Sequence, residues 1–208
     1  TVPVGIACWI TRKPIFTHEQ NVVIGSANKL LSKISKINFH GFPFSDMHAF
    51  GGISIPWRNP IFTGNPVRES FINQREEIYS SWHNPEELQS IKRSIDDKNE
   101  YRIYITGGSQ GSEYINKYVP KIFKGFSNNI KIKHQCGKNN LQEVRNIYLK
   151  EGIDAEVSEF YQNPVEQILW SDFVISRGGA LSLSEITSLR RGVVIIPLPT
   201  SIDNHQVE

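Results

Sequence analysis

The second half of the chain alternates short apolar runs with stretches of helical periodicity. The predicted strands are residues 101–106, 130–135, 155–157, 173–176 and 193–196, and the predicted helices are residues 110–123, 141–151, 164–169 and 181–189. Strands that alternate with helices at these lengths form a parallel sheet covered on both faces, so we expect an α/β fold. Ligands bind such sheets at the carboxyl ends of the strands.

The first part of the chain has a less regular pattern of apolar positions. Residues 14–17 look like the end of a strand, and residues 24–34 are predicted to form a helix. Lys29, Lys33 and Lys36 are expected to share one face of that helix. The sequence therefore predicts fewer regular elements here than in the second half.

Two polar or loop-rich stretches separate the regular segments. Residues 40–60 are dense in Gly, Pro, Phe and Asn and predict an irregular connection. Residues 73–98 are rich in charge and predict an exposed helix and linker. We place a domain boundary near Arg68, which divides the chain into residues 1–68 and 69–208.

Composition narrows the class of protein. In 208 residues, 23 Lys and Arg face 21 Asp and Glu, so the net charge of +2 gives no general attraction to nucleic acid. Cys8 and Cys136 are too sparse for a disulfide framework and predict free thiols in the cytoplasm. No apolar run reaches the roughly 18 to 20 residues that span a bilayer. Both ends look like interior sequence, which predicts a fragment.

Two glycine-rich loops each follow a predicted strand and open a predicted helix. The first is Gly-Gly-Ser-Gln-Gly at residues 107–111, and the second begins with Arg-Gly-Gly at residues 177–179. Two helix N-termini with free N–H groups can hold a diphosphate between them. Ser109 and Ser182 can donate hydroxyls, and Glu185 can accept from ribose hydroxyls. Alternatively, Glu185 is only a carboxylate stabilised by the helix dipole.

Other phosphate-binding and metal-binding motifs are absent from the sequence. Neither loop has the Gly-x-Gly-x-x-Gly spacing of a dinucleotide site, and no Walker motif is present. No Asp-x-Asp, His-x-x-x-His or Cys-x-x-Cys array exists to hold a metal. We therefore expect neither a cofactor nor a metal.

With these elements established, the sequence resembles the MurG family of bacterial N-acetylglucosaminyltransferases. The resemblance runs nearly end to end through short motifs in matching order. They are His18-Glu19-Gln20-Asn21, Asn28-Lys29-Leu30-Leu31, Gly64-Asn65-Pro66-Val67-Arg68, Gly107-Gly108-Ser109-Gln110-Gly111, His134-Gln135, Ser184-Glu185-Ile186, Pro197-Leu198-Pro199 and Asp203-Asn204-His205-Gln206.

The resemblance implies an inverting GT-B glycosyltransferase with two Rossmann-like domains and parallel sheets. Its N-terminal domain would bind the acceptor and would be incomplete here, and its C-terminal domain would bind UDP-N-acetylglucosamine. The sugar would pass to lipid I, which is undecaprenyl-pyrophosphoryl-MurNAc-pentapeptide, and form lipid II for peptidoglycan synthesis, cell shape and cell division. The protein would be peripheral on the cytoplasmic face of the bacterial inner membrane.

The resemblance also assigns roles to individual positions. Ser109 would contact the diphosphate, Arg68 would face it across the cleft, and Asn21 would lie on the acceptor side. Ala180, Leu181, Ser182, Leu183, Ser184 and Glu185 would wrap phosphate and ribose, Gln206 would hold the sugar hydroxyls, and Tyr161 would stack by the uracil. Arg68 can instead be a hinge salt bridge, Asn21 a turn residue, Tyr161 a core residue and Gln206 a surface residue.

The sequence does not identify the catalytic base. The family's N-terminal glycine loop, which carries a proposed catalytic histidine, is missing, as is everything after the His-Gln motif at residues 205–206. Glu19 is the one carboxylate in an acceptor-side motif, and it is equally a structural hydrogen-bonder that holds Asn21. The alternative functions are a non-catalytic nucleotide-sugar-binding subunit that needs a partner chain to complete the acceptor domain, and a UDP-N-acetylglucosamine epimerase.

A membrane surface is the remaining predicted partner. Trp9 lies beside Arg12 and Lys13, and Lys29, Lys33 and Lys36 follow. These residues can form an aromatic anchor within a basic rim. The alternative is that Trp9 is a core residue and that the lysines are merely solvated.

Overall fold

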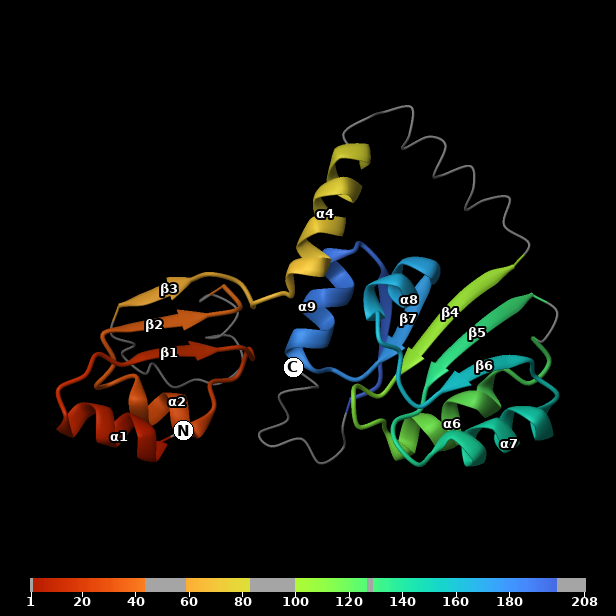
Figure 1. Cartoon of the computed structure of the whole chain (residues 1–208), viewed down its shortest axis with the longest axis horizontal. Helices are drawn as coiled ribbons and strands as arrows, with labels where there is room; N and C mark the ends of the chain where they lie inside the picture. The colour runs from red at the N-terminus through yellow and green to blue at the C-terminus, as the bar shows by residue number, and fades with distance from the viewer. Residues whose placement is uncertain (1, 44–58, 83–99, 127–128, 198–208) are drawn as a thin grey trace. The chain divides into compact units, whose positions relative to one another are not determined.

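The computed structural model describes residues 2–43, 59–82, 100–126 and 129–197. Contacts between residues divide the chain into two compact units at the bond between Pro66 and Val67, next to the boundary expected near Arg68. Each unit has a parallel sheet of its own (Figure 1), which agrees with the α/β class.

The first unit is a small sheet with helices packed on one side. Its described elements are α1 (Val2–Ile10), β1 (Phe16–Glu19), α2 (Ser26–Leu31), β2 (Ile37–His40) and β3 (Pro60–Phe62). The strands lie in the order β1-β2-β3 and are parallel, and both helices lie on the same side of them (Figure 1). A Cβ on Gly5 would lie 2.3 Å from Cδ2 of Leu31, so α1 packs closely on α2.

The second unit repeats the strand-helix pattern along its length. Its described elements are α4 (Glu69–Trp82), β4 (Tyr101–Thr106), α6 (Glu113–Ile122), β5 (Ile130–Gln135), α7 (Leu141–Glu151), β6 (Ala155–Ser158), α8 (Pro164–Trp170), β7 (Phe173–Ser176), α9 (Ala180–Ser188) and β8 (Gly192–Ile195).

The strand order of the second unit creates a switch point. The order is β6-β5-β4-β7-β8 and all pairs are parallel. From β4 the chain therefore winds outward to β5 and β6, and then returns to the other side of β4 to form β7 and β8. In open α/β sheets the crevice at such a reversal is where ligands bind. The glycine loops follow β4 and β7, the two strands on either side of the reversal.

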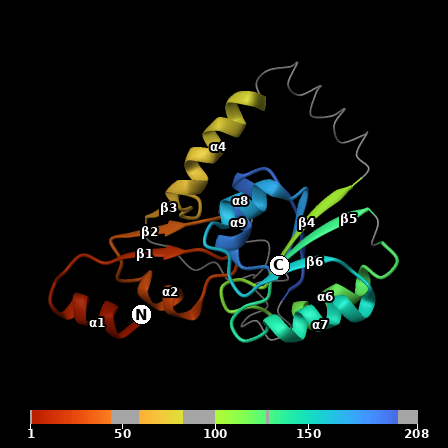
Figure 2. The ribbon, with the colours of Figure 1, turned by 45° about the vertical axis from the view of Figure 1, so that its right-hand side comes forward.

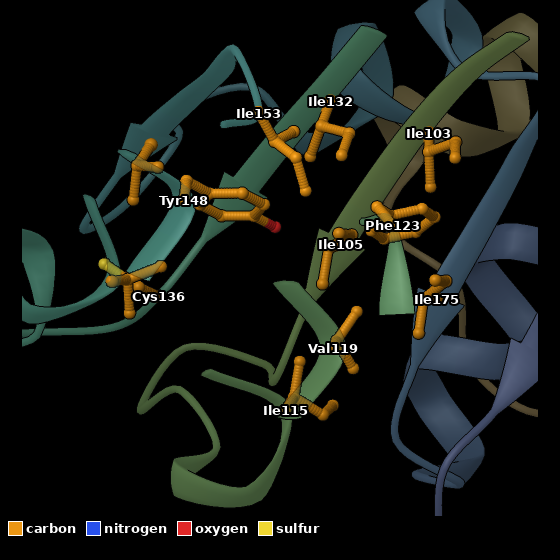
Figure 3. Packing of buried hydrophobic residues seen from close by; sticks show 12 residues of the cluster. Ile103, Ile105, Ile115, Val119, Phe123, Ile132, Cys136, Tyr148, Ile153 and Ile175 are labelled. Atoms are coloured by element: carbon orange, nitrogen blue, oxygen red, sulfur yellow. The ribbon is translucent and has the colours of Figure 1, made fainter. Parts of the chain in front are cut away.

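Helices cover both faces of the second sheet. Successive side chains of β4 point to opposite faces, so this strand packs against helices on both sides. Ile103 and Ile105 pack with Ile115 of α6 and Tyr148 of α7 in one buried cluster (Figure 3). Tyr104 points to the other face, into a cluster built from α4, α8 and α9. Figure 2 shows α6 and α7 together on one side of the strands. The sheet is thus the middle layer of three.

The structure confirms the predicted strands and helices of the second half, with small shifts at their ends. The bounds of β4, β5, α7 and β7 are those predicted. The helix predicted over 110–123 begins later, at Glu113, because the glycine loop continues to Gly111 and Ser112 caps the helix. The side-chain oxygen of Ser112 accepts a hydrogen bond of 3.3 Å from the N–H of Ile115.

The first half departs further from the predictions. The helix predicted over 24–34 is too long, since α2 ends at Leu31 and Lys33 and Lys36 lie beyond it. The backbone leaves the helix after Leu31, although the N–H and the hydroxyl of Ser35 both still donate to the Leu31 carbonyl, at 3.0 and 2.7 Å. The strand expected at 14–17 is β1, shifted toward the C-terminus.

Other first-half predictions missed elements or fall outside the described residues. The sequence analysis did not predict α1, β2 or β3. Residues 44–58 of the expected irregular connection, and 83–98 of the expected linker, lie outside the described residues. The exposed helix expected within 73–98 is α4, which begins earlier, at Glu69. None of the described helices is both long and apolar enough to cross a bilayer.

Candidate functional site

A pocket of about 250 Å³ opens in the second unit at the carboxyl ends of β4 and β5. Its lining includes Arg68, Ser109, Tyr161, Ser182 and Glu185, all of which the sequence analysis selected. A larger cavity of about 370 Å³ lies between α7 and the start of β6. The smaller pocket is the better candidate, because it lies at the end of the sheet where ligands bind α/β folds.

The glycine loop after β4 depends on two close backbone approaches. Gly108 and Gly111 have φ angles of +85° and +77°, in the left-handed region that favours glycine. A Cβ on Gly111 would lie 2.1 Å from the carbonyl oxygen of Cys136. A Cβ on Gly137 would lie 2.4 Å from the carbonyl oxygen of Gln110. The two loops therefore touch backbone to backbone, and only glycine fits on either side.

The second glycine loop is tied to the first through a side chain. Nη2 of Arg177 donates a hydrogen bond of 2.8 Å to Oγ of Ser112, the residue that caps α6. Helix α9 begins after Gly179, which has no side chain to accept the first amide protons. Those N–H groups, at the positive end of the helix dipole, are available to an anion. The tie holds them in a fixed relation to the glycine loop after β4.

Arg68 and Glu185 meet at the wall of the pocket. Nε of Arg68 donates to Oε1 of Glu185 at 2.6 Å, and Nη2 donates to Oε2 at 2.9 Å. The hydrogen bond to Glu185 raises the pKa of Arg68. The side chain of Arg68 is 57% exposed and that of Glu185 only 17%. The guanidinium also stacks 4.9 Å from the ring centre of Phe71 on α4. Two residues expected to bind substrate thus bind each other here.

Tyr161, on the loop after β6, forms another part of the pocket wall. Its ring meets Tyr104 edge to face, with centroids 6.0 Å apart. Its hydroxyl donates to Oε1 of Glu156 at 2.9 Å. Burial raises the pKa of Tyr161 well above its usual value, and raises that of Tyr104 to about 12, so both stay protonated at neutral pH. Phe160 beside it is 57% exposed and offers a flat apolar surface.

A buried polar network supports the glycine loop from behind. His134 at the end of β5 contacts the hydroxyl of Tyr148 through Nδ1 at 2.9 Å and Oδ1 of Asn116 through Nε2 at 3.1 Å. Nδ2 of Asn116 donates to the Cys136 carbonyl at 2.8 Å. Burial lowers the pKa of His134 to about 3, so the ring is neutral. Because Nδ2 of Asn116 donates to the Cys136 carbonyl, the amide oxygen faces His134, and Nε2 is the ring nitrogen that donates to it. The Cys136 carbonyl, against which Gly111 packs, is thereby fixed.

Glu19 in the first unit is fully engaged with the loop that follows it. Its carboxylate accepts from the backbone N–H groups of Asn21 at 3.0 Å and Gly25 at 2.9 Å, and from Nδ2 of Asn28 at 2.9 Å. The residue is only 3% exposed. These contacts match the structural role weighed for Glu19, and they favour it over the role of a proton acceptor. Asn21 is half-buried beside it.

Residues 102–208 match the sequence profile of the glycosyltransferase family 28 C-terminal domain, which spans about half of the chain. The matched residues include both glycine loops and most of the pocket. The chain belongs to glycosyltransferase family 28. The resemblance to the MurG family within it is also confirmed, by the relatives that follow.

Relatives of this family 28 chain share one name. A UDP-N-acetylglucosamine--N-acetylmuramyl-(pentapeptide) pyrophosphoryl-undecaprenol N-acetylglucosamine transferase of Aeromonas hydrophila is 33% identical over 204 residues, covering 98% of this chain and 50% of that protein. The enzyme of the same name from Buchnera aphidicola is 39% identical over 198 residues, covering 95% and 49%. The chain thus spans about half the length of the curated relatives it matches.

Solved structures agree with the family 28 assignment. The crystal structure of Acinetobacter baumannii MurG matches with a TM-score of 0.71 and 25% identity, covering 99% of this chain and 52% of that one. A UDP-GlcNAc 2-epimerase from Neisseria meningitidis, solved with UDP-GlcNAc bound, matches with a TM-score of 0.57 and 16% identity, covering 94% and 55%. At that identity the second likeness shows a shared fold alone.

The predicted site of this family 28 chain is assembled only in part. The other α9 positions selected from the sequence, Ala180, Leu181, Leu183 and Ser184, lie on the helix but outside the lining of the pocket. Gln206 lies outside the described residues. Glu19 and Asn21 belong to the other compact unit. The roles assigned to all these residues stay predictions.

Sequence reasoning assigned no role to three residues that shape the pocket of this family 28 chain. Tyr104, Thr106 and Gln135 line it and hydrogen-bond with one another and with the loops. A signal was available, because Thr106 and Gln135 are the last residues of adjacent parallel strands. Residues at such strand ends meet at the ligand-binding edge of the sheet.

Proposed function

We propose that the second unit binds UDP-N-acetylglucosamine in the pocket beside β4, and that the protein transfers N-acetylglucosamine from it to lipid I. The product would be lipid II, used in peptidoglycan synthesis. One observation carries this proposal. The two glycine loops follow β4 and β7, the strands on either side of the switch point, and Ser109, Ser182 and Glu185 line one pocket there. The names of the relatives supply the identity of the sugar and of the acceptor.

The arrangement of charges suits a nucleoside diphosphate. The N-terminus of α9 and the glycine loop after β4 present backbone N–H groups to the diphosphate, with the hydroxyls of Ser109 and Ser182 beside them. Glu185 accepts from ribose hydroxyls, and the wall of Phe160 and Tyr161 receives the uracil. In the reaction, an acceptor hydroxyl loses its proton to a general base and attacks the anomeric carbon as the bond to UDP breaks. The helix dipole and Arg68 stabilise the charge on the departing phosphate.

The first unit is the proposed acceptor and membrane side. Trp9 is 61% exposed, which contradicts its alternative as a core residue. Ile6 and Ile10 of the same helix are 44% and 69% exposed, and Arg12 and Lys13 follow at the surface. Exposed apolar side chains with adjacent cations are the features of a helix that lies at an anionic membrane surface. Such a contact would bring the protein to a lipid-linked acceptor as a peripheral protein on the cytoplasmic face.

The alternatives are a binding subunit and an epimerase. The epimerase likeness rests on fold alone, whereas relatives at 33% and 39% identity are named as transferases. A binding subunit would bind UDP-N-acetylglucosamine but would show no turnover without the partner chain that it needs. The two readings therefore differ in activity and agree in binding.

Calorimetry with UDP and UDP-N-acetylglucosamine in EDTA tests the donor site, and radiolabelled sugar transfer to lipid I in the full-length protein tests the reaction. We expect binding in EDTA, because dipoles and side chains supply the positive charge. Binding that requires added magnesium would contradict the metal-free site. Binding without any sugar transfer would favour the subunit.

A further inference from the structure

The side-chain amide of Gln135 lies between the two loops that shape the pocket. Its Nε2 donates to the carbonyl oxygen of Gly108 at 3.0 Å and to Oγ1 of Thr106 at 3.3 Å. Its Oε1 accepts from the backbone N–H of Tyr161 at 3.2 Å and from the hydroxyl of Tyr104 at 3.3 Å. An amide offers two donors and two acceptor positions, and here all of them are used. The residue is 5% exposed, so water replaces none of these bonds.

On one side, the amide sets the direction of a backbone N–H in the glycine loop. The Gly108 carbonyl accepts from Gln135 and also from the N–H of Gly111 at 3.1 Å. In a trans peptide the carbonyl and the next N–H lie in one plane and point in opposite directions. Fixing the Gly108 oxygen therefore aims the N–H of Ser109 away from Gln135. Gly108 has a φ of +85° and no side chain, so without the Gln135 bond only the N–H of Gly111 holds its carbonyl and the peptide is less restrained.

On the other side, the same amide holds the loop that carries the aromatic wall. Its oxygen accepts the N–H of Tyr161, and the bond fixes the peptide that joins Tyr161 to Phe160. The hydroxyl of Ser158 donates a hydrogen bond of 3.0 Å to the Phe160 carbonyl, which fixes the other end of that peptide. One side chain thus sets the positions of both the phosphate-facing loop and the base-facing loop.

We infer that Gln135 is a positioning residue that aligns the diphosphate and uracil subsites with each other. The inference rests on the proposed function, since it assumes that a uridine diphosphate occupies the pocket. Gln135 acts through Ser109 and Tyr161. Replacing it with an apolar residue of similar length removes four hydrogen bonds and releases both loops.

Calorimetric titration of the chain with UDP and competition titration with uridine test this role in the Gln135→Met variant. The matched control is Gln167→Met, because Gln167 is also buried but accepts a bond from Lys133 at 3.0 Å outside the pocket lining. We expect Gln135→Met to weaken the binding of uridine about tenfold, because uridine uses one of the two released subsites. UDP uses both, so its binding should weaken about a hundredfold. The control should lower the melting temperature while leaving both affinities within about twofold.

Three results separate the possible failures. If the parent chain does not bind UDP, the proposed function itself is wrong. If the parent binds and Gln135→Met weakens uridine and UDP by the same factor, the amide positions the base side alone and the alignment role is wrong. If both affinities are unchanged while the melting temperature falls, Gln135 is only a core residue. The ratio of the two affinities is the decisive quantity, because a loss of stability alone leaves it unchanged.

Discussion

Arg68 and Glu185 form a two-pronged ion pair, with Nε to Oε1 at 2.6 Å and Nη2 to Oε2 at 2.9 Å. Both line the pocket that we assign to the nucleotide-sugar. If Glu185 accepts from ribose hydroxyls and Arg68 contacts the diphosphate, ligand binding exchanges this pair for two contacts to the ligand. Because Arg68 is well exposed, water screens the pair and the exchange costs little.

The first prediction concerns Arg68 in turnover. A forked guanidinium over the leaving phosphate stabilises the transition state more than the ground state. Arg68→Ala should lower kcat by roughly 100- to 1,000-fold in the full-length protein, with UDP affinity changed several-fold at most. Arg68→Lys should recover only part, because a point charge lacks the forked geometry. An unchanged kcat with a lower melting temperature would make Arg68 a structural ion-pair residue.

The second prediction concerns Glu185 in binding. Glu185→Ala should weaken UDP binding by about 1 to 3 kcal/mol, because the ribose hydroxyls lose a charged acceptor. Glu185→Gln keeps one acceptor oxygen and should lose less. Calorimetry in EDTA measures both variants. Binding of the ribose-free ligand pyrophosphate should not weaken, because the substitution frees Arg68 from its ion pair. An equal loss for pyrophosphate would place Glu185 outside the ribose subsite.

The third prediction is a dependence of stability on pH. Burial lowers the pKa of His134 to about 3, below its ordinary value of 6.5. Between these two pH values the ring is protonated in the unfolded chain and neutral in the folded chain. The neutral ring contributes its full stability above about pH 6.5, and that contribution is lost as the pH falls from 6.5 toward 3. Between pH 7 and pH 5 the free energy of unfolding should drop by about 2 kcal/mol.

Urea denaturation of the parent and of His134→Gln measures this effect. The variant should be less stable at pH 7, since its contacts to Tyr148 and Asn116 are altered, yet it should lack this part of the pH dependence. Identical pH profiles for the two proteins would show that another group titrates.

The fourth prediction concerns the backbone contact of Gly111. Gly111→Ala should destabilise the protein through its positive φ and through overlap with the Cys136 carbonyl. Gly152 is a matched control, because its φ is +72° and open space surrounds the position of a Cβ. Gly152→Ala should cost about 1 to 2 kcal/mol for the left-handed backbone alone. Gly111→Ala should cost about 1 to 3 kcal/mol more and should weaken UDP binding, which Gly152→Ala leaves intact.

The fifth prediction concerns membrane contact. Trp9→Ala combined with Gln at Lys29, Lys33 and Lys36 should reduce sedimentation with anionic vesicles at least about tenfold, since each lysine near such a surface contributes about 1 kcal/mol. Leu149→Ala is the control, because Leu149 is 75% exposed on the other unit. Equal sedimentation of the parent and the combined variant would place the membrane contact elsewhere.

Local pattern predicted the second unit well because its strands carry alternating or continuous apolar residues and glycine marks its two proposed ligand-binding loops. The same reasoning failed for α1 and β2, whose short sequences carry no clear period. In the site, a resemblance of motifs found Ser109 and Glu185. It included Gln135 in a motif but assigned it no role, because the role of that amide depends on four partners, at residues 104–108 and 161. Such a role becomes visible only when the strands are paired.

The contact between Gly111 and Gly137 also limits how the two loops can change over generations. Each glycine faces backbone atoms beside the other, and both already carry the smallest side chain in the genetic code. A substitution at one position therefore has no compensating substitution at the other, in contrast to a pair of packed side chains that can exchange volume. Suppressor screens starting from a Gly111 variant should recover true revertants at that codon and none at codon 137.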